Sequence, residues 1–179
     1  MANVRFIKNR AINLIKYPVN WIRCHGTPGM QAKFALTTKD SAKLATLVSF
    51  SKKLTVLGTV AGSVYADEAT LEDLSHYDHF RRYFEFSEYE NKVLIPLAGN
   101  AAAHPFTIGK LSSNPRLYEA VAKNPRVIKI VDSARQSDSS AFLAALSSCP
   151  ILHVRQAIKQ NKHTPDIIRE RITEENDPQ

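Results

Sequence analysis

The sequence predicts an all-α protein, a short α-solenoid of paired helices preceded by an N-terminal helical region. Three observations support this fold class: helical spacing of apolar residues near the N-terminus, acidic residues typical of a helix start before an aromatic segment, and a helix-ending phrase that repeats from Leu97 onward. We divide the chain into four parts. They are residues 1–53, a basic N-terminal helical region; 54–95, an aromatic-rich linker with capping helices; 96–172, a helical repeat array; and 173–179, an acidic tail.

The N-terminal region is expected to contain two helices joined by a loop. In residues 4–16 the apolar side chains recur every three or four positions, and Pro18 ends or bends that helix. Residues 24–29 hold two glycines and a proline, which predicts a loop. A second helix is expected over residues 37–50, with Asp40 or one of its neighbours as N-cap.

The linker region is partly ambiguous. Valine and threonine in residues 54–65 favour a strand, whereas Gly58 and Gly62, four positions apart, suit a helix packed closely on a neighbour. Residues 67–90 are predicted to form a helix in which Tyr77, Phe80 and Phe84 share one face that packs in the core. This aromatic helix is expected to cover the N-terminal end of the repeat array.

A short phrase recurs in the repeat array: an apolar residue, two small or polar residues, and an asparagine that proline usually follows. It occurs at residues 97–100, 111–115, 121–125 and 158–161, and residues 146–150 carry Cys149 in place of the asparagine. Asn124 follows Asn100 by 124 − 100 = 24 residues. We expect each asparagine to adopt a left-handed conformation that ends a helix. Residues 132–140 interrupt the period and are expected to form a loop.

These residues resemble the leucine-rich repeat variant family, a HEAT-like solenoid whose units pair two helices without a strand. The best match is residues 154–165, which read Val-Arg-Gln-Ala-Ile-Lys-Gln-Asn-Lys-His-Thr-Pro. Residues 117–125 are similar, with Tyr118 where arginine is expected. The resemblance covers only residues 97–172. It implies a structural fold that binds other macromolecules and has no catalytic residues to transfer.

The positive charge is concentrated at the N-terminus. Residues 1–53 hold ten Lys or Arg and one acid, Asp40, a net charge of +9, whereas the remainder holds fourteen basic and sixteen acidic residues, a net charge of −2. The repeat region is therefore expected to be nearly neutral. Residues 1–53 can contact nucleic-acid phosphates, lie on an anionic membrane surface, act as a targeting segment, or form a solvated helix packed on the solenoid. The candidate partner or phosphate contacts are Arg5, Lys8, Arg10, Lys16, Arg23, Lys52 and Lys53.

We predict no catalytic residue, no metal site and no cofactor. Cys24 and His25 are adjacent but lack a third orienting group, and His76 and His79 lack further metal ligands. Two cysteines far apart in sequence favour a reducing compartment, and we expect a cytoplasmic location. The longest nearly apolar stretch, residues 54–66, is about a third shorter than the roughly 20 residues of a membrane span.

The predicted function is that of a non-enzymatic adaptor. Its helical repeat surface is expected to bind a protein partner, and the basic N-terminus is expected to anchor the complex. The alternative is a nucleic-acid-binding protein that contacts phosphates through residues 1–53.

Overall fold

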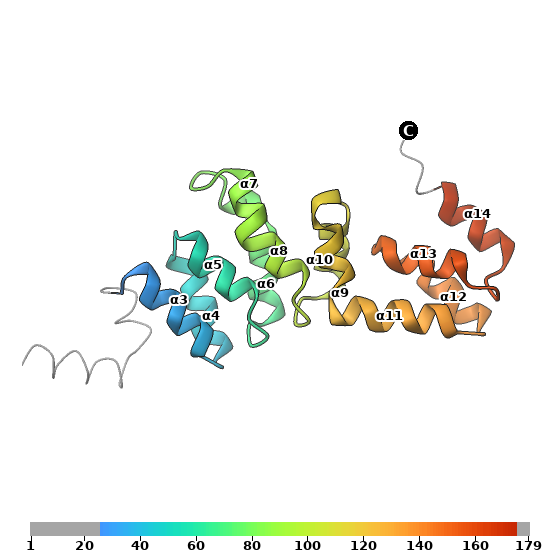
Figure 1. Ribbon diagram of the computed structural model, residues 1–179, viewed down its shortest axis with the longest axis horizontal. Helices are drawn as coiled ribbons and strands as arrows, with labels where there is room; N and C mark the ends of the chain where they lie inside the picture. Colours follow the sequence, from blue (N-terminus) through green and yellow to red (C-terminus); the bar gives the residue numbers. More distant parts are fainter. Residues whose placement is uncertain (1–25, 175–179) are drawn as a thin grey trace, which may run out of the picture. The chain divides into compact units, whose positions relative to one another are not determined.

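The computed structural model of the chain describes residues 26–174 (Figure 1). All regular secondary structure in this range is helical and none of it is strand, so the predicted all-α class is confirmed. The chain divides into two compact units, Met1–Leu97 and Ala98–Gln179. The predicted N-terminal helix, residues 4–16, lies outside the described residues.

The described part of the first unit opens with four short helices. They are α3 (Pro28–Thr37), α4 (Ser41–Phe50), α5 (Leu54–Ala61) and α6 (Glu68–Ser75). The Asp40 carboxylate accepts a hydrogen bond from the backbone N–H of Lys43 at 3.2 Å, which satisfies a donor at the start of α4. The helix predicted over residues 37–50 therefore begins at Ser41.

Helix α3 occupies residues that the sequence analysis assigned in part to a loop. Pro28 lies in its first turn, where a helix needs no N–H from that position, and the Thr27 hydroxyl accepts a hydrogen bond from Met30 N at 3.3 Å. Here the proline marks the start of a helix.

The ambiguous segment, residues 54–65, contains helix α5 and no strand. Its buried residues are Val56, Leu57, Val60 and Ala61. Helix α5 packs on α3 and on η2 (Glu90–Leu94), a π-helical turn. A Cβ atom on Gly58 would overlap the carbonyl oxygen of Lys92 in that turn. Gly58 thus permits a backbone contact that a larger residue would prevent.

The single helix predicted over residues 67–90 is wrong. Helix α6 ends at Ser75, and the 3-10 turn η1 (Tyr77–His79) and further turns follow before α7 (Phe86–Tyr89). Three aromatic rings of this segment pack around the ring of Tyr89. A single straight helix would place Tyr89 on a different face from these three residues, so the chain turns instead.

Tyr89 is the centre of this aromatic cluster. The ring centroids of Tyr77, Phe80 and Phe84 lie 5.4, 5.2 and 6.2 Å from that of Tyr89. Tyr89 is fully buried, and its hydroxyl donates a hydrogen bond to the Leu74 carbonyl at 2.8 Å. Burial raises the pKa of Tyr89, so its hydroxyl stays protonated as a donor.

Helix α7, the turn η2 and α8 (Ile95–Ala98) form one continuous helical segment. Its buried positions recur every four residues, as 89, 93 and 97 and as 90, 94 and 98. A step of four residues in a regular α-helix rotates the side chain by about 40° beyond a full turn, so this pattern would drift off one face. The π turn at 90–94 has more residues per turn than an α-helix, which offsets this rotation. Positions 89, 93 and 97 therefore all remain buried.

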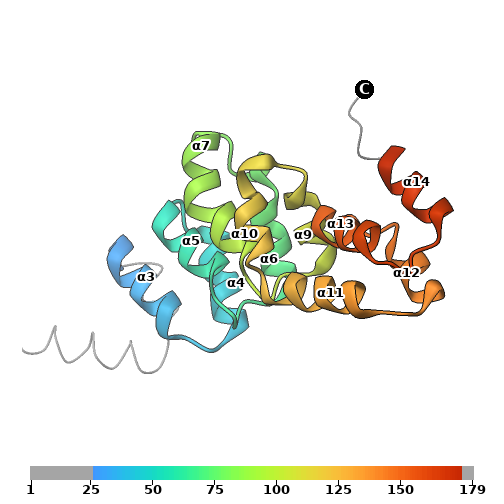
Figure 2. The same cartoon turned by 45° about the vertical axis from the view of Figure 1, so that its right-hand side comes forward.

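The second unit consists of short helices, with α13 packed on α11, α12 and α14. They are α9 (Pro105–Ser112), η3 (Pro115–Leu117), α10 (Tyr118–Ala122), α11 (Pro125–Gln136), α12 (Ser140–Leu146), α13 (Leu152–Gln160) and α14 (Asp166–Glu174). The loop predicted at residues 132–140 is wrong for its first half, because α11 continues through Gln136. In Figures 1 and 2, α11 and α13 run side by side.

The asparagines of the repeated phrase do not end helices in the way predicted. Asn124 and Asn161 have extended backbones, with φ of −66° and −72°, and no residue in the described range has a positive φ. Both side chains are buried and donate hydrogen bonds to earlier backbone carbonyls. Asn124 Nδ2 donates to the carbonyls of Ala98 and Asn100 at 2.8 and 2.9 Å.

Asn161 repeats this arrangement. Its Nδ2 atom donates to the carbonyls of Ala134, Arg135 and Ser137 at 2.7, 3.1 and 2.8 Å. Each asparagine therefore reaches a carbonyl 24 residues earlier, which is the spacing seen in the sequence. The two arrangements are offset by 161 − 124 = 137 − 100 = 37 residues.

The asparagine bonds also fix the direction of the helices. Asn161 directly follows α13 and binds the last carbonyls of α11, so the C-terminal ends of these two helices lie together. Since α11 and α13 pack on each other, they run in the same direction.

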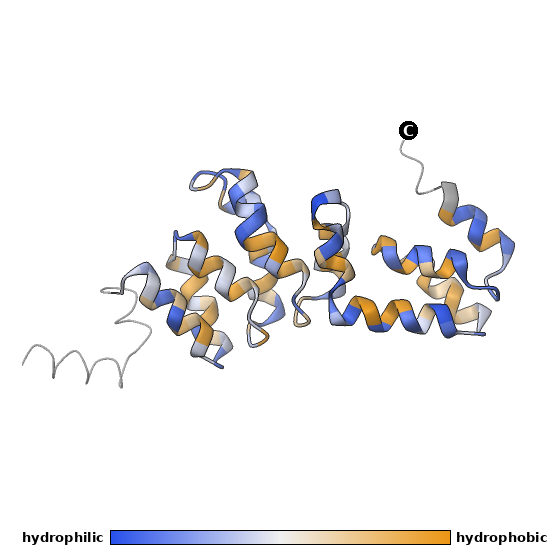
Figure 3. Ribbon diagram, viewed as in Figure 1, coloured by the Kyte–Doolittle hydropathy of each residue, from blue (hydrophilic) through white to orange (hydrophobic). Residues whose placement is uncertain are grey.

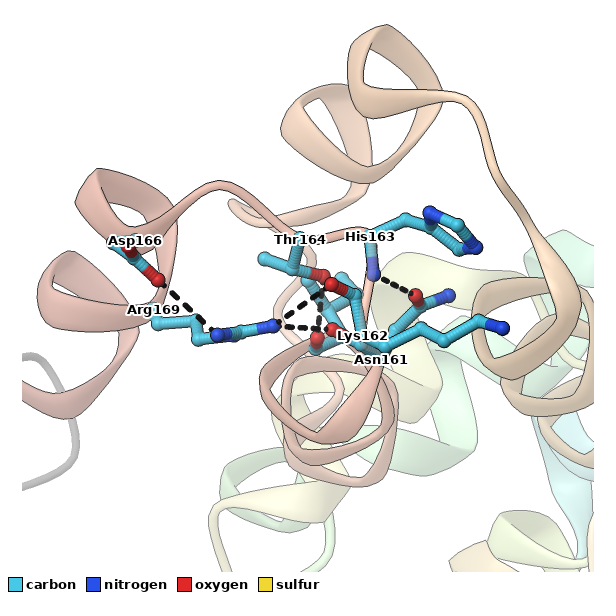
Figure 4. Close-up of polar contacts among 7 residues, drawn as sticks. Asn161, Lys162, His163, Thr164, Asp166 and Arg169 are labelled. Atoms are coloured by element: carbon cyan, nitrogen blue, oxygen red, sulfur yellow. Dashed lines mark hydrogen bonds and ion pairs between the residues drawn. The ribbon is translucent and has the colours of Figure 1, made fainter.

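Arg169 braces the junction after α13 (Figure 4). Its guanidinium reaches back from α14 to the carbonyls of Asn161 and Lys162 at 2.8 and 3.2 Å and to the Asp166 carboxylate at 3.1 Å. The amide oxygen of Asn161 accepts a hydrogen bond from His163 N at 2.7 Å. The turn between α13 and α14 is thus held by side chains on both of its sides.

Candidate functional site

Five of the seven predicted contact residues lie outside the described part of the chain. Arg5, Lys8, Arg10, Lys16 and Arg23 lie outside the described residues, as do Cys24 and His25. Lys52 and Lys53 are exposed in the short connection between α4 and α5.

Lys52 belongs to a cluster of cations around an exposed tyrosine of the first unit. Its Nζ atom lies 4.5 Å from the centroid of the Tyr83 ring, and Arg82 Cζ lies 5.0 Å from the same centroid. A hydrogen bond from Lys52, aided by the charge of Arg82, lowers the pKa of the Tyr83 hydroxyl below its usual value. The sequence analysis missed Arg82 and Tyr83, although the Arg-Arg-Tyr run within the aromatic segment was a signal for such a cluster.

The second unit has a groove between α11 and α13, with one wall extended by α10. Its volume is about 240 Å³. That is less than the roughly 300–1,000 Å³ of typical small-molecule sites. The apolar residues that line it are Ala122, Val127, Ile128, Val131 and Ala157, and the polar ones are Asp132, Arg135, His153, Gln156 and Gln160. Apolar and hydrophilic residues follow each other closely along α11 (Figure 3).

Two glutamines on α13 give the groove a regular pattern of hydrogen-bonding groups. Gln156 and Gln160 are exposed and lie four residues apart, which is about 6 Å along a helix. In an extended peptide, residues two positions apart are about 6.6 Å apart and present their backbone groups to the same side. The two amides, each both a donor and an acceptor, match that repeat.

His153 forms part of the α13 wall. Its ring centroid lies 4.2 Å from that of Tyr118, and its Nδ1 atom is buried without a hydrogen-bond partner among residues 26–174. Burial lowers the pKa of His153, because the charged imidazolium loses hydration there. The groove wall therefore presents a neutral imidazole at neutral pH.

The other candidate chemistry does not form a site. His76 Nε2 contacts the Glu72 carboxylate at 3.1 Å and its ring stacks on that of His79, with centroids 5.4 Å apart. Within residues 26–174 there is no group of three His, Cys, Asp or Glu side chains that could hold a metal ion. No helix in the same range combines the length and the hydropathy of a membrane span.

The division into two units changes the interpretation of the charge. Residues 98–179 hold eleven Lys or Arg and eight Asp or Glu, a net charge of +3, whereas residues 54–97 hold three basic and eight acidic residues, a net charge of −5. The net charge of −2 for residues 54–179, from which a nearly neutral repeat region was expected, is the sum of these two values. The unit that contains the groove is itself basic.

Comparisons of the chain with models of protein families, with curated proteins and with solved structures give no match. The resemblance to the leucine-rich repeat variant family therefore remains a prediction from residues 97–172.

Proposed function

We propose that this protein is a non-enzymatic adaptor whose second unit binds a short, extended segment of a partner protein in the groove between α11 and α13. The proposal includes the HEAT-like solenoid character of residues 97–172 and a cytoplasmic location, both expected from the sequence. We call the apolar residues of α11 that line the groove, Val127, Ile128 and Val131, its floor. The main support is the pairing of this apolar floor with Gln156 and Gln160, whose spacing matches the backbone repeat of an extended peptide.

The composition of the groove favours a peptide over a small-molecule substrate. Ile128 is 46% exposed on the floor, so an aliphatic side chain of a ligand can pack there without displacing the core. Backbone recognition by amides gives affinity without requiring one particular ligand sequence, as in other modes of peptide recognition.

The proposal is tested by selecting displayed random peptides against the full chain. Peptides enriched on the wild type are expected to lose about tenfold in affinity for Ile128→Asn, because the apolar contact is removed. Ile167→Asn is the matched control: Ile167 is 76% exposed on α14 and does not line the groove, so binding should be unchanged. Absence of enrichment, or peptides that bind both variants as well as the wild type, would contradict the proposal.

A second candidate function is supported by the cluster around Tyr83. An exposed ring flanked by Lys52 and Arg82 has the composition of surfaces that bind single-stranded nucleic acids, where bases stack and cations contact phosphates. In a gel shift with a single-stranded oligonucleotide, we expect retention at low salt that is lost at higher salt. Lys52→Gln should weaken retention more than Lys33→Gln, a matched charge change at an exposed position of α3. No retention at low salt would rule this candidate out.

A further inference from the structure

The two helices that form the groove are strongly basic. Together α11 and α13 contain five Lys or Arg and one acid, Asp132, a net charge of +4. The basic residues are Arg126, Lys129, Arg135, Arg155 and Lys159. Asp132 lines the groove beside Arg135, so the excess of positive charge lies on the two helices around it. A net positive field of this kind attracts acidic ligands and speeds their association.

Arg135 is the cation that lines the groove itself. It lies 4.0 Å from Asp132, and both side chains are more than half exposed, at 58% and 55%. An exposed pair at this distance contributes little, so a ligand carboxylate can compete for the guanidinium. The planar guanidinium can bind such a carboxylate with two parallel hydrogen bonds.

The spacing along α11 matches the spacing along α13. Val131 on the floor and Arg135 on the rim are four residues apart, about 6 Å along the helix, as are Gln156 and Gln160. Because α11 and α13 run in the same direction, both pairs run along the same axis of the groove. An extended peptide that aligns its backbone with the glutamines therefore places side chains two positions apart near the floor and near Arg135.

We infer that the groove binds an acidic, extended peptide segment in which an aliphatic residue lies two positions from an aspartate or glutamate. The aliphatic side chain packs on Ile128 and Val131, and the carboxylate binds Arg135. The inference rests on the proposed peptide-binding function and adds the chemistry of the partner to it. An apolar floor favours an aliphatic side chain over a nucleotide, whose sugar and phosphates are polar.

The test is a charge exchange between the protein and a selected peptide. Peptides enriched on the full-length wild type are expected to share an aliphatic residue and an acid two positions apart. Arg135→Glu should weaken their binding about 10- to 100-fold, the range for loss of a charge-assisted hydrogen bond. Replacing the peptide acid with lysine should restore much of the affinity for that variant. Lys162→Glu, the same charge change at an exposed position outside the groove, should change binding by less than about threefold through screening.

The outcomes separate the inference from the proposed function. Enriched peptides that depend on Ile128 but show no preference for acids would overturn the inference and leave the peptide-binding function intact. Failure of the lysine peptide to bind Arg135→Glu would overturn the assigned contact. Competition by a single-stranded oligonucleotide that Ile128→Asn abolishes would assign the groove to nucleic acid and overturn the inference. Absence of any groove-dependent peptide would remove both.

Discussion

Replacing Gly58 with alanine is expected to lower the free energy of unfolding by about 3 kcal/mol. The new methyl group would overlap the Lys92 carbonyl oxygen, which belongs to the backbone of a buried segment and cannot move aside as a flexible side chain can. The higher helix propensity of alanine offsets only roughly 0.5–1 kcal/mol of this cost. The unfolding midpoint in urea, followed by circular dichroism, should fall by about 1 M or more.

Gly62→Ala is the control for this result. Gly62 lies four residues further along, just after α5, where a Cβ atom would lie 3.6 Å from the Gly58 carbonyl oxygen and 3.7 Å from Pro96 Cβ. These are ordinary contacts, and the φ of −84° at Gly62 suits any residue, so alanine there should be neutral or stabilise by up to about 1 kcal/mol. Equal effects of the two substitutions would show that the close contact at Gly58 does not limit the packing of α5.

Asn161→Ala is expected to cost about 3 kcal/mol, because it leaves the last carbonyls of α11 without the donor that now satisfies them. Asn161→Asp should cost more, although it keeps the shape of the side chain. It replaces the amide donor with a negatively charged group that faces three carbonyl oxygens. Both variants are measured by the same urea titration.

Asn114→Ala provides the comparison within the same repeated phrase. The amide oxygen of Asn114 accepts a hydrogen bond from Arg116 N at 3.1 Å at a more exposed position, so its loss should cost about 1 kcal/mol. If Asn161→Ala proves no more damaging than Asn114→Ala, the bonds that span 24 residues contribute nothing to stability beyond local capping.

The N-cap of α4 was predictable from the sequence. Asp40 was a candidate cap in the sequence, and it does cap α4, because capping depends on residues a few positions apart. The aromatic segment was not predictable in this way. Its spacing fits a helix, but the positions of Tyr77 and Phe80 are set by packing on Tyr89, a tertiary contact that no periodicity encodes.

The repeated asparagines show the same limit in a different form. The spacing of 24 residues between Asn100 and Asn124 was visible in the sequence, but the expected role of these asparagines was local, as residues that tolerate a left-handed backbone. The structure gives Asn124 and Asn161 extended backbones and long-range hydrogen bonds instead. The sequence spacing thus indicated that Asn124 and Asn100 meet, but it did not indicate the contact of Asn161 with Ser137. In both cases the backbone preference of asparagine suggested the wrong role.

The candidate groove was the least predictable feature. Ile128 and Gln156 belong to helices that are separated in sequence. Nothing in the sequence distinguishes either residue from other positions of an amphipathic helix. Only the packing of α13 on α11 in a common direction brings them to one groove. The predicted contacts at Lys52 and Lys53 depended on charge alone, and charge does not specify which exposed cations gather around one ring.

The bonds of Asn161 also bear on the order in which the chain acquires its structure during synthesis. The last carbonyls of α11 leave the ribosome well before the asparagine that satisfies them, since 24 residues separate Ser137 from Asn161. Until then, water has to satisfy those carbonyls, and the end of the helix frays. Asn124 imposes the same delay on the turn that ends at Asn100. A nascent chain therefore completes these two helix ends only after a further 24 residues have been synthesised.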